Sequence, residues 1–282
     1  LSLYGRFDFI LAKDGTPKIL EFNADTPTSL LEASVIQWQW KEDVFPECDQ
    51  FNGIHEGLVQ SWKDIFPKKG EIHFAGALEN NEDTGTLQYL ASTAMEVGFS
   101  TRVLDMQALD LQNGRFFDPA GELVNRCFKL YPWEWMVDES PDGCLAEMEW
   151  LEPIWKLVMS NKAILATLYE LFPDSPYVLP CYLSRPRSGL FCKKPVFSRE
   201  GHNVSVVDIR DWEEYVRIAE TEGDYNTGAY VYQEYVEPTA YSGRYPVIGS
   251  WIIGGEAAGI GIRENRMEVT DNLSEFVPHI IG

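Results

Sequence analysis

The chain has 282 residues, of which 45% are hydrophobic and 13% aromatic, and it carries a formal net charge of −21. This length and apolar content predict a folded globular protein with two lobes, or one domain with an insertion. The acidic excess argues against a general nucleic-acid binder, although it is compatible with a local anion site governed by its own basic side chains.

The cysteines and the hydropathy pattern bear on the location of the protein. The five cysteines are scattered, and none forms a Cys-x-x-Cys pair, which fits a reducing cytoplasm and speaks against a structural zinc site. The best apolar run, residues 247–262, is interrupted by glycines and Glu256, so we expect no membrane-spanning segment. We expect no signal peptide and a cytoplasmic protein. The chain begins inside a predicted strand, which leaves open whether a natural N-terminus precedes Leu1.

The first predicted element is a β-hairpin. Residues 4–10 and 18–25 have the alternation of strands, and Asp14-Gly15 between them is a strong turn signal. Alternate side chains share one face of a strand. We therefore expect one polar face and one apolar face, with Phe7 and Phe9 directed into a core.

The polar face of this hairpin carries Arg6, Asp8, Glu21 and Asn23. Carboxylate and amide oxygens are the ligands that magnesium takes, usually together with substrate phosphates, and a neighbouring arginine suits a phosphate or a carboxylate. A solvated hairpin with cross-strand ion pairs would show the same pattern. The spacing alone leaves both interpretations open.

Two helices are predicted after the hairpin. Ser29 and Glu32 have the spacing of a capping box, which would start a helix that runs to about Glu42. Trp38 lies on the apolar stripe of this helix and is expected in the core. Residues 54–66 are predicted to form the second helix.

A βαβ unit is predicted next. Residues 71–78 have the pattern of a buried strand, Asp83 or Thr84 would cap a helix that ends at Gly98, and residues 101–104 would form the second strand. The polar residues that follow the first strand would lie where open α/β sheets bind ligands. A polar loop is the alternative.

The middle of the chain contains less regular patterns. Residues 109–122 are predicted to form a hairpin around Asn113-Gly114, and the Trp-rich residues 131–155 an irregular domain connection. From Ser160 to Pro173 the pattern is helical, with Lys162 in the first turn. A cation there opposes the helix dipole by roughly 0.3–1 kcal/mol, which indicates a lysine held for a ligand, with a solvated lysine as the alternative.

The next segment is predicted as a lobe of strands. Residues 189–197 and 204–207 would be paired strands, and the loop 198–203 between them contains a glycine that lets backbone N–H groups approach phosphates. A helix is predicted over 211–222. Residues 229–236 would form a strand that leaves the lobe.

A last hairpin is predicted from residues 246–253 and 257–262, around Gly254-Gly255. Arg263 follows its second strand and is adjacent to Glu264 in the sequence. A structural ion pair is one interpretation of Arg263, and a role in a binding site is the other.

Taken together, these segments resemble the synthetase domain of the glutathionylspermidine synthase family, in the ATP-grasp class of carboxylate–amine ligases. The resemblance spans nearly the whole chain, and several motifs in the family's order are far more specific than any one of them. The motifs are Gly5-Arg-Phe-Asp8, Glu21-Phe-Asn-Ala-Asp25, Asn161-Lys162, Lys194-Pro-Val-Phe-Ser-Arg-Glu-Gly201, Gln233-Glu-Tyr235 and Gly259-Ile-Gly-Ile-Arg263.

The resemblance implies an α+β fold, a permuted, glutathione-synthetase-like ATP-grasp with an associated α/β substrate-binding (pre-ATP-grasp) region. It implies that Asp8, Glu21 and Asn23 hold Mg²⁺. It implies that Arg6 and Arg263 act as catalytic residues on phosphoryl and acyl-phosphate oxygens. The residues implied to bind ATP are Lys162, Lys194, Gly201, Gln233, Glu234 and Tyr235.

The same resemblance implies a division of the chain into four parts. Residues 1–52 would supply the metal-binding hairpin and helix of the ATP-grasp core, and residues 53–150 the α/β substrate region. Residues 151–236 would form the lid lobe with the phosphate-binding lysines. Residues 237–282 would return to the core.

The implied activity is ATP-dependent formation of an amide bond, through an acyl phosphate, between a small-molecule or peptide carboxylate and an amine such as a polyamine. ATP and Mg²⁺ are the implied cofactors, and no nucleic-acid or membrane partner is expected. The chain shows no trace of the amidase domain of bifunctional members, and it has Thr26-Pro-Thr-Ser29 where thiol-handling members have a cysteine. The match is therefore closer to stand-alone members, and the acid, the amine and the oligomeric state stay open.

Two other functions are compatible with the sequence. A catalytically silent ATP-grasp protein would retain the nucleotide site without turnover. A metal-dependent hydrolase would use Asp8 and Glu21 but would not require the lysines.

Overall fold

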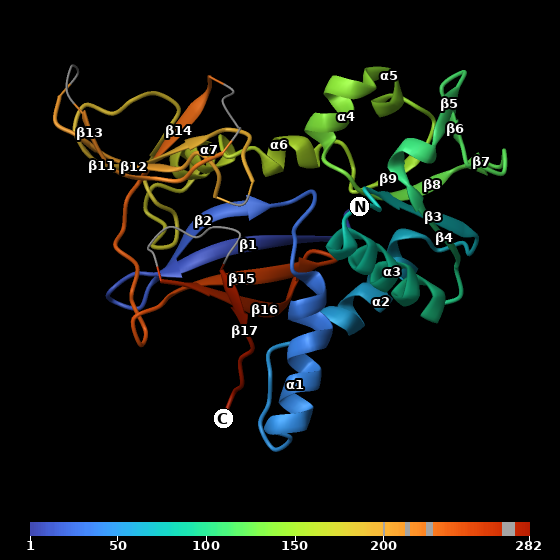
Figure 1. Cartoon of the computed structure of the whole chain (residues 1–282), viewed down its shortest axis with the longest axis horizontal. Coiled ribbons are helices and arrows are strands. Elements are labelled where there is room, and N and C mark those ends of the chain that lie inside the picture. Colours follow the sequence, from blue (N-terminus) through green and yellow to red (C-terminus); the bar gives the residue numbers. More distant parts are fainter. Residues whose placement is uncertain (200, 212–214, 224–227, 267–273) are drawn as a thin grey trace.

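The computed structural model of the chain describes residues 1–199, 201–211, 215–223, 228–266 and 274–282. Over these residues the strands form two five-stranded sheets, one four-stranded sheet and one three-stranded sheet. Figure 1 shows one five-stranded sheet above the other on one side of the molecule, and the four-stranded sheet with its helices on the other side. The predicted mixture of helices and sheets is confirmed. Within the described part, no helix has both the length and the apolarity to cross a membrane.

The core sheet is antiparallel and joins the two ends of the chain, in the order β17-β16-β15-β1-β2. Its strands are β1 (Tyr4–Leu11), β2 (Pro17–Asn23), β15 (Tyr245–Ile253), β16 (Glu256–Asn265) and β17 (Glu275–Val277). Both predicted hairpins are confirmed. They pair with each other through β1 and β15, so Asp8 lies opposite Glu21 on one side and Gly249 on the other.

The second five-stranded sheet, here called the lid sheet, has the order β10-β14-β11-β12-β13. Its strands are β10 (Cys181–Tyr182), β11 (Gly189–Pro195), β12 (Ser205–Ile209), β13 (Tyr215–Glu220) and β14 (Tyr230–Glu234). The helix predicted over 211–222 is wrong, because Tyr215–Glu220 pairs with β12 as a strand; residues 212–214 of that prediction lie outside the described residues. Helix α7 (Ile164–Leu171) packs Leu165 against this sheet, as its apolar stripe predicts. It begins after Lys162, so the predicted position of this lysine in the first turn of a helix from Ser160 is wrong.

The four-stranded sheet is parallel, with the order β4-β3-β8-β9. Its strands are β3 (Glu71–Gly76), β4 (Ser100–Asp105), β8 (Arg126–Leu130) and β9 (Glu149–Leu151), and its helices are α2 (Ile54–Ile65) and α3 (Asn81–Glu96). The βαβ unit is confirmed, but the cap of α3 is Asn80. Its extended backbone lets the Asn80 side chain accept a hydrogen bond from the Glu82 N–H at 2.9 Å, as an N-cap does.

A small three-stranded sheet covers the other face of β3 and β8. It contains β5 (Asp110–Gln112), β6 (Arg115–Phe117) and β7 (Leu123–Val124), and a short 3₁₀ turn, η2 (Met106–Ala108), precedes it. The predicted hairpin around Asn113-Gly114 is confirmed, since both residues have positive φ. Phe116 is buried against Ala75 and Cys127, which attaches this sheet to the parallel one.

The prediction that residues 131–155 are irregular is wrong. They contain α4 (Trp133–Glu139), α5 (Pro141–Cys144) and β9, and α6 (Lys156–Ser160) follows. Pro132 and Pro141 stand at the starts of helices, where a proline costs no intrahelical hydrogen bond. The prolines therefore mark helix starts and not a loop.

The first helix differs from its prediction in two respects. It begins with a π turn, η1 (Glu32–Ile36), and continues as α1 (Gln37–Val44), which projects from the body in Figure 1. Ser29 has φ +65°, not the extended backbone of an N-cap residue, so the predicted capping box is wrong. Trp38 is 43% exposed and not in the core, because this helix turns Ala33 and Gln37 toward the core sheet.

One hydrophobic core joins the core sheet to the parallel sheet. Trp62 and Phe74 of the α/β lobe are fully buried with Phe128, Tyr4 and Trp251. Tyr4 stacks on Trp251 at 6.0 Å between ring centroids and lies 5.7 Å from Phe128. The start of β1 thus packs against both the core sheet and the parallel sheet.

Candidate functional site

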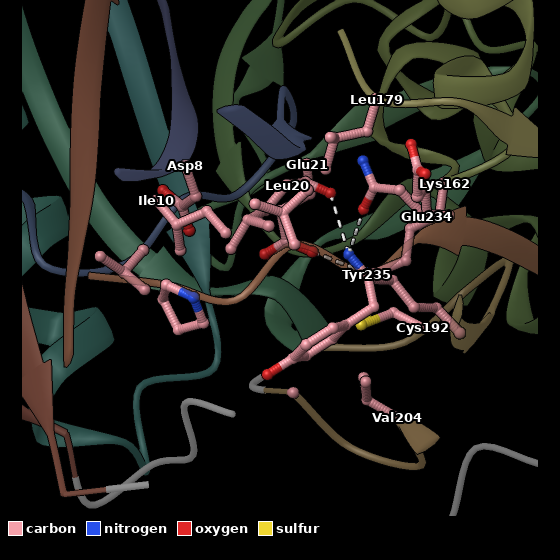
Figure 2. A pocket seen from close by; sticks show the side chains of 16 residues that line it. Asp8, Ile10, Leu20, Glu21, Lys162, Leu179, Cys192, Val204, Glu234 and Tyr235 are labelled. Atoms are coloured by element: carbon pink, nitrogen blue, oxygen red, sulfur yellow. Dashed lines mark hydrogen bonds and ion pairs between the residues drawn. The ribbon is translucent and has the colours of Figure 1, made fainter. Parts of the chain in front are cut away.

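A pocket lies between the hairpin β1–β2 and the lid sheet (Figure 2). It encloses about 810 Å³ of space, a volume that includes the open mouth of the pocket. Asp8 and Ile10 lie on one side of the view, and Cys192, Glu234 and Tyr235 lie on another. The polar hairpin face predicted from the sequence therefore faces this pocket.

This polar face is more buried than its apolar counterpart. Arg6 and Asp8 are 4% and 2% exposed, whereas Phe7 and Phe9 are only half-buried. Phe7 stacks on Phe22 at 4.0 Å between ring centroids. The predicted core position of the two phenylalanines is wrong, and so is the solvated alternative for the polar face, because other parts of the chain cover that face.

Two arginines hold the Asp8 carboxylate. Arg6 donates from Nε to Oδ1 at 2.6 Å and from Nη2 to Oδ2 at 2.9 Å, and Arg263 donates from Nη2 to Oδ2 at 2.9 Å. Burial and the positive charge of the neighbouring Arg6 lower the pKa of Arg263, because the two guanidinium groups lie close together and repel each other. A Cβ on Gly249 would lie 2.7 Å from Arg6 Cδ, so glycine at this position makes room for the guanidinium.

Glu21 connects the hairpin to the middle of the chain. Asn23 donates from Nδ2 to Asp8 Oδ2 at 3.2 Å and to Glu21 Oε1 at 3.1 Å. Lys162 Nζ lies 3.1 Å from Glu21 Oε2 and donates to the Ser198 carbonyl at 2.6 Å. Burial by itself would raise the pKa of Glu21. The nearby lysines, Lys162 more than Lys194, outweigh burial and lower the pKa to about 2. Glu21 is thus a carboxylate at neutral pH.

A second lysine joins the lid sheet to the hairpin. Lys194 Nζ donates to Gln233 Oε1 at 2.7 Å and to the Leu20 carbonyl at 3.1 Å, and Gln233 Nε2 donates to the Ile19 carbonyl at 2.8 Å. Lys194 and Gln233 are 6% and 2% exposed. Two buried side chains of adjacent lid strands therefore contact the backbone of β2.

The lid side of the pocket carries several apolar side chains, here called the apolar slot. Leu179, Cys192 and Val204 line it together with Tyr235. The backbone N–H groups of Glu234 and Tyr235 donate to the carbonyls of Pro180 at 2.7 Å and Leu190 at 2.9 Å, which fixes the strand where it leaves the lid. Such a slot suits a flat ring bound between the lid and the core sheet.

The structure brings all the predicted site residues together. Those that line the pocket are Asp8, Glu21, Lys162, Lys194, Gly201, Gln233, Glu234 and Tyr235. The other three, Arg6, Asn23 and Arg263, each donate a hydrogen bond to Asp8. Gly201 has φ +70°, so the glycine is required by the turn that it makes.

The possible magnesium ligands of this pocket are two carboxylates and one amide. Among the residues that the structure describes, no three His, Cys, Asp or Glu side chains are arranged to hold a metal ion by themselves. Magnesium usually takes one or two carboxylates plus substrate phosphates. Asp8 and Glu21, joined by the Asn23 amide, fit an ion that arrives with a nucleotide.

Sequence reasoning assigned no role to Arg199 or to Glu134. Arg199 lies in the loop after β11, and its Nη2 is 2.5 Å from Glu134 Oε1 on α4, while Nη1 donates to Thr26 Oγ1. Both residues line a second cavity that shares Glu21 and Lys162 with the first. The position of Arg199 in the glycine-containing loop could have indicated a role for it. Nothing in the sequence marks Glu134 as its partner.

Comparison with solved structures places this architecture in the ATP-grasp class, of the glutathione-synthetase-like kind. A "Putative gamma-glutamylcysteine synthetase" of Methylobacillus flagellatus superposes with a TM-score of 0.67 at 10% identity, covering 99% of this chain and 80% of that chain. At this identity the likeness concerns the fold.

The family model described as glutathionylspermidine synthase preATP-grasp matches residues 1–282, and the chain belongs to this family. A Haemophilus influenzae protein named "Putative acid–amine ligase" is 38% identical over 98% of this chain and 74% of its own length. Trypanothione synthetase of Crithidia fasciculata is 28% identical over 96% of this chain and 46% of its own length. The chain therefore spans about three quarters of the first relative and about half of the second.

Proposed function

We propose that the chain is an ATP-dependent acid–amine ligase that forms an amide bond through an acyl phosphate and releases ADP and phosphate. One observation carries the proposal. Two carboxylates of the N-terminal hairpin, Asp8 and Glu21, and two lysines of the later chain, Lys162 and Lys194, converge on one pocket. The names of the relatives support the same reaction class.

The first step joins two anions, because ATP phosphorylates a carboxylate, so the site must supply positive charge. Magnesium, held by Asp8, Glu21 and Asn23, would neutralise phosphate oxygens when bound. Arg6 and Arg263 now neutralise Asp8, and they would turn to the phosphoryl and acyl-phosphate oxygens when the metal takes over that role.

Lys162 and Lys194 would likewise exchange their present protein partners for phosphate oxygens. Lys162 now neutralises Glu21, and Lys194 is held by Gln233 and a backbone carbonyl. A phosphate oxygen is a stronger partner for an ammonium group than a neutral amide oxygen. Glu234 and Tyr235 would border the adenine in the apolar slot, where Gln233 ties their strand to β2.

In the second step the free amine attacks the acyl phosphate. Holding the two reactants in line can contribute about 7–11 kcal/mol relative to a bimolecular encounter. The loop that carries Ser198 and Gly201 would cover the nucleotide and exclude water, which would otherwise hydrolyse the intermediate. The hydrogen bonds from Lys162 to Ser198 and from Arg199 to Thr26 and Glu134 support this, since they hold the loop against Lys162, the end of the hairpin and α4.

We infer that the acid is a small-molecule or peptide carboxylate and that the amine is a polyamine or another small amine. The net charge of −21 favours the approach of a cationic substrate. The proposed division assigns residues 1–52 and 237–282 to the ATP-grasp core, 53–150 to the substrate region and 151–236 to the lid lobe.

An ADP-release screen tests the proposal. Purified protein is incubated with Mg·ATP and a matrix of peptides and amines, and product masses are determined. We expect ADP release that requires both a carboxylate and an amine, with a product heavier than the acid by the mass of the amine less water. Nucleotide binding without turnover in any combination would favour the silent ATP-grasp protein, and product formation without ATP would favour the hydrolase.

A further inference from the structure

A buried lysine, Lys156, lies where the two strands of the metal-binding hairpin part. β1 and β2 are paired as far as Arg6 and Asn23. Just beyond that pair, Lys156 Nζ donates to the Tyr4 carbonyl at 2.6 Å and to the Ala24 carbonyl at 2.8 Å. The ammonium group therefore joins the two strands after their own pairing has ended.

The charge of Lys156 is balanced by Glu152. The two side chains are 4% and 0% exposed, and Lys156 Nζ lies 3.1 Å from Glu152 Oε2. The other carboxylate oxygen, Oε1, accepts hydrogen bonds from the N–H groups of Leu3 at 2.9 Å and Tyr4 at 3.0 Å. Burying two ions is costly unless further hydrogen bonds satisfy them. Lys156 has its two carbonyl partners, and the Glu152 carboxylate is satisfied through Oε1, whereas Oε2 has the ion pair but no hydrogen bond among the described residues. The pair thus holds the peptide groups on both sides of Tyr4.

Lys156 also begins the helix that leads to the phosphate lysine. Helix α6 (Lys156–Ser160) lies between α7 and α4 in Figure 1. Its first residue contacts Ala24, just past the end of β2, and Lys162, two residues beyond the end of the helix, contacts Glu21 of β2. The segment 156–162 is therefore attached at two points to β2 and the residue that follows it. The contact of Lys156 with Ala24 therefore sets the position of Lys162 relative to Glu21.

We propose that Lys156 is a positioning residue for the ligase reaction, which fixes the spacing between Lys162 and the carboxylates of the hairpin. Lys156 does not line the nucleotide pocket, so it acts through the backbone of β1, β2 and α6. This inference rests on the proposed function, because the spacing matters only if magnesium and phosphates bind there. A merely structural lysine would affect unfolding but not the affinity of the folded protein for Mg·nucleotide.

Calorimetric titration with Mg²⁺ and a β,γ-imido analogue of ATP tests the inference. The test variant is Glu152→Gln/Lys156→Met, which removes both charges and keeps the side-chain volumes, so that no buried ion is left alone. The matched control is Glu152→Gln alone, in which Lys156 keeps both carbonyls. We expect the Kd of the double variant to rise about 10- to 100-fold, as for other groups that orient metal ligands, and the Kd of the control to stay close to wild type.

Two further variants separate positioning from stability. Arg102→Gln breaks the ion pairs with Glu71 and Asp118 in the α/β lobe, and it should lower the thermal midpoint without changing the Kd. If the methionine variant does not fold, Glu152→Gln/Lys156→Gln replaces it. The glutamine at position 156 can still donate to one carbonyl, so we expect an intermediate Kd.

Wild-type affinity in a folded Lys156 variant would overturn the inference while leaving the proposed function intact. If the wild-type protein does not bind the Mg·nucleotide at all, the proposed function is wrong, and the inference fails with it.

Discussion

Lys162 Nζ lies 3.1 Å from Glu21 Oε2, so a lysine from the middle of the chain meets a carboxylate of the N-terminal hairpin. Lys162 is buried and the Glu21 side chain is 27% exposed, so this contact differs from an ion pair between two solvated side chains. A metal–phosphate complex bound here would have the same pair of neighbours, with the metal ion at the Glu21 carboxylate and a phosphate at the Lys162 ammonium group.

The Asp8→Asn variant should lose ADP release by at least about a hundredfold, which is the usual cost of removing one group that stabilises charge in a transition state. The exchange keeps the shape of the side chain, so circular dichroism should show a folded protein. Asp14→Asn is the matched control, because Asp14 lies in the exposed turn of the same hairpin and bonds only locally to the Thr16 N–H. Wild-type turnover in Asp8→Asn would remove the metal-binding role of this residue.

The Lys194→Met variant should raise the KM for ATP by about 10- to 100-fold, since hydrogen bonds to charged groups contribute roughly 1.5–3 kcal/mol. Lys193→Met is the control. Lys193 is adjacent in the sequence, but its Nζ lies 3.8 Å from the centroid of the Tyr230 ring and it does not line the proposed nucleotide pocket. Steady-state kinetics of both variants measures the difference, and equal effects would contradict the assignment of Lys194.

The stability of the ligand-free protein should fall in acid because of Glu21. Lys162 and Lys194 outweigh burial and lower the pKa of Glu21 to about 2, from the ordinary value near 4.5. A lowered pKa contributes stability that is fully present above the ordinary value and is lost as the pH falls toward the native value. Urea unfolding between about pH 5 and pH 2 should therefore show a loss that is smaller in Glu21→Gln. Parallel curves for both proteins would contradict the lowered pKa.

The Glu134→Gln variant should weaken the contact that draws the lid loop to α4, because it removes the charge opposite Arg199. We expect more ATP hydrolysis in the absence of the amine, since a less closed loop admits water to the intermediate. The control is Glu139→Gln on the same helix, whose carboxylate accepts from the Tyr131 hydroxyl at 2.6 Å. ADP release measured with the acid alone tests this, and an unchanged rate in Glu134→Gln would count against the loop acting as a cover.

Much of the site could be predicted because its signals are local. Alternation along two short strands was sufficient to put Arg6, Asp8, Glu21 and Asn23 on one face, and the structure confirms this. The turns at Asn113-Gly114 and Gly254-Gly255 were also recognised from residues that tolerate positive φ. The convergence of the lysines on that face came from the family resemblance and not from any periodicity.

The errors arose where distant parts of the chain decide the outcome. The apolar stripe of α1 predicted a buried Trp38, but other side chains of that helix face the core sheet. Residues 215–220 pair with β12, and this pairing overrides their helical pattern. The Lys156 contacts join residues more than a hundred positions apart, and no local pattern marks them.

The most direct test of the central claim is a crystal structure with Mg²⁺ and a non-hydrolysable ATP analogue. We predict that the triphosphate lies between Asp8 and Glu21 on one side and Lys162 and Lys194 on the other, with the base in the slot beside Tyr235. A nucleotide bound elsewhere on the chain, with the hairpin and the two lysines not contacting it, would contradict the account.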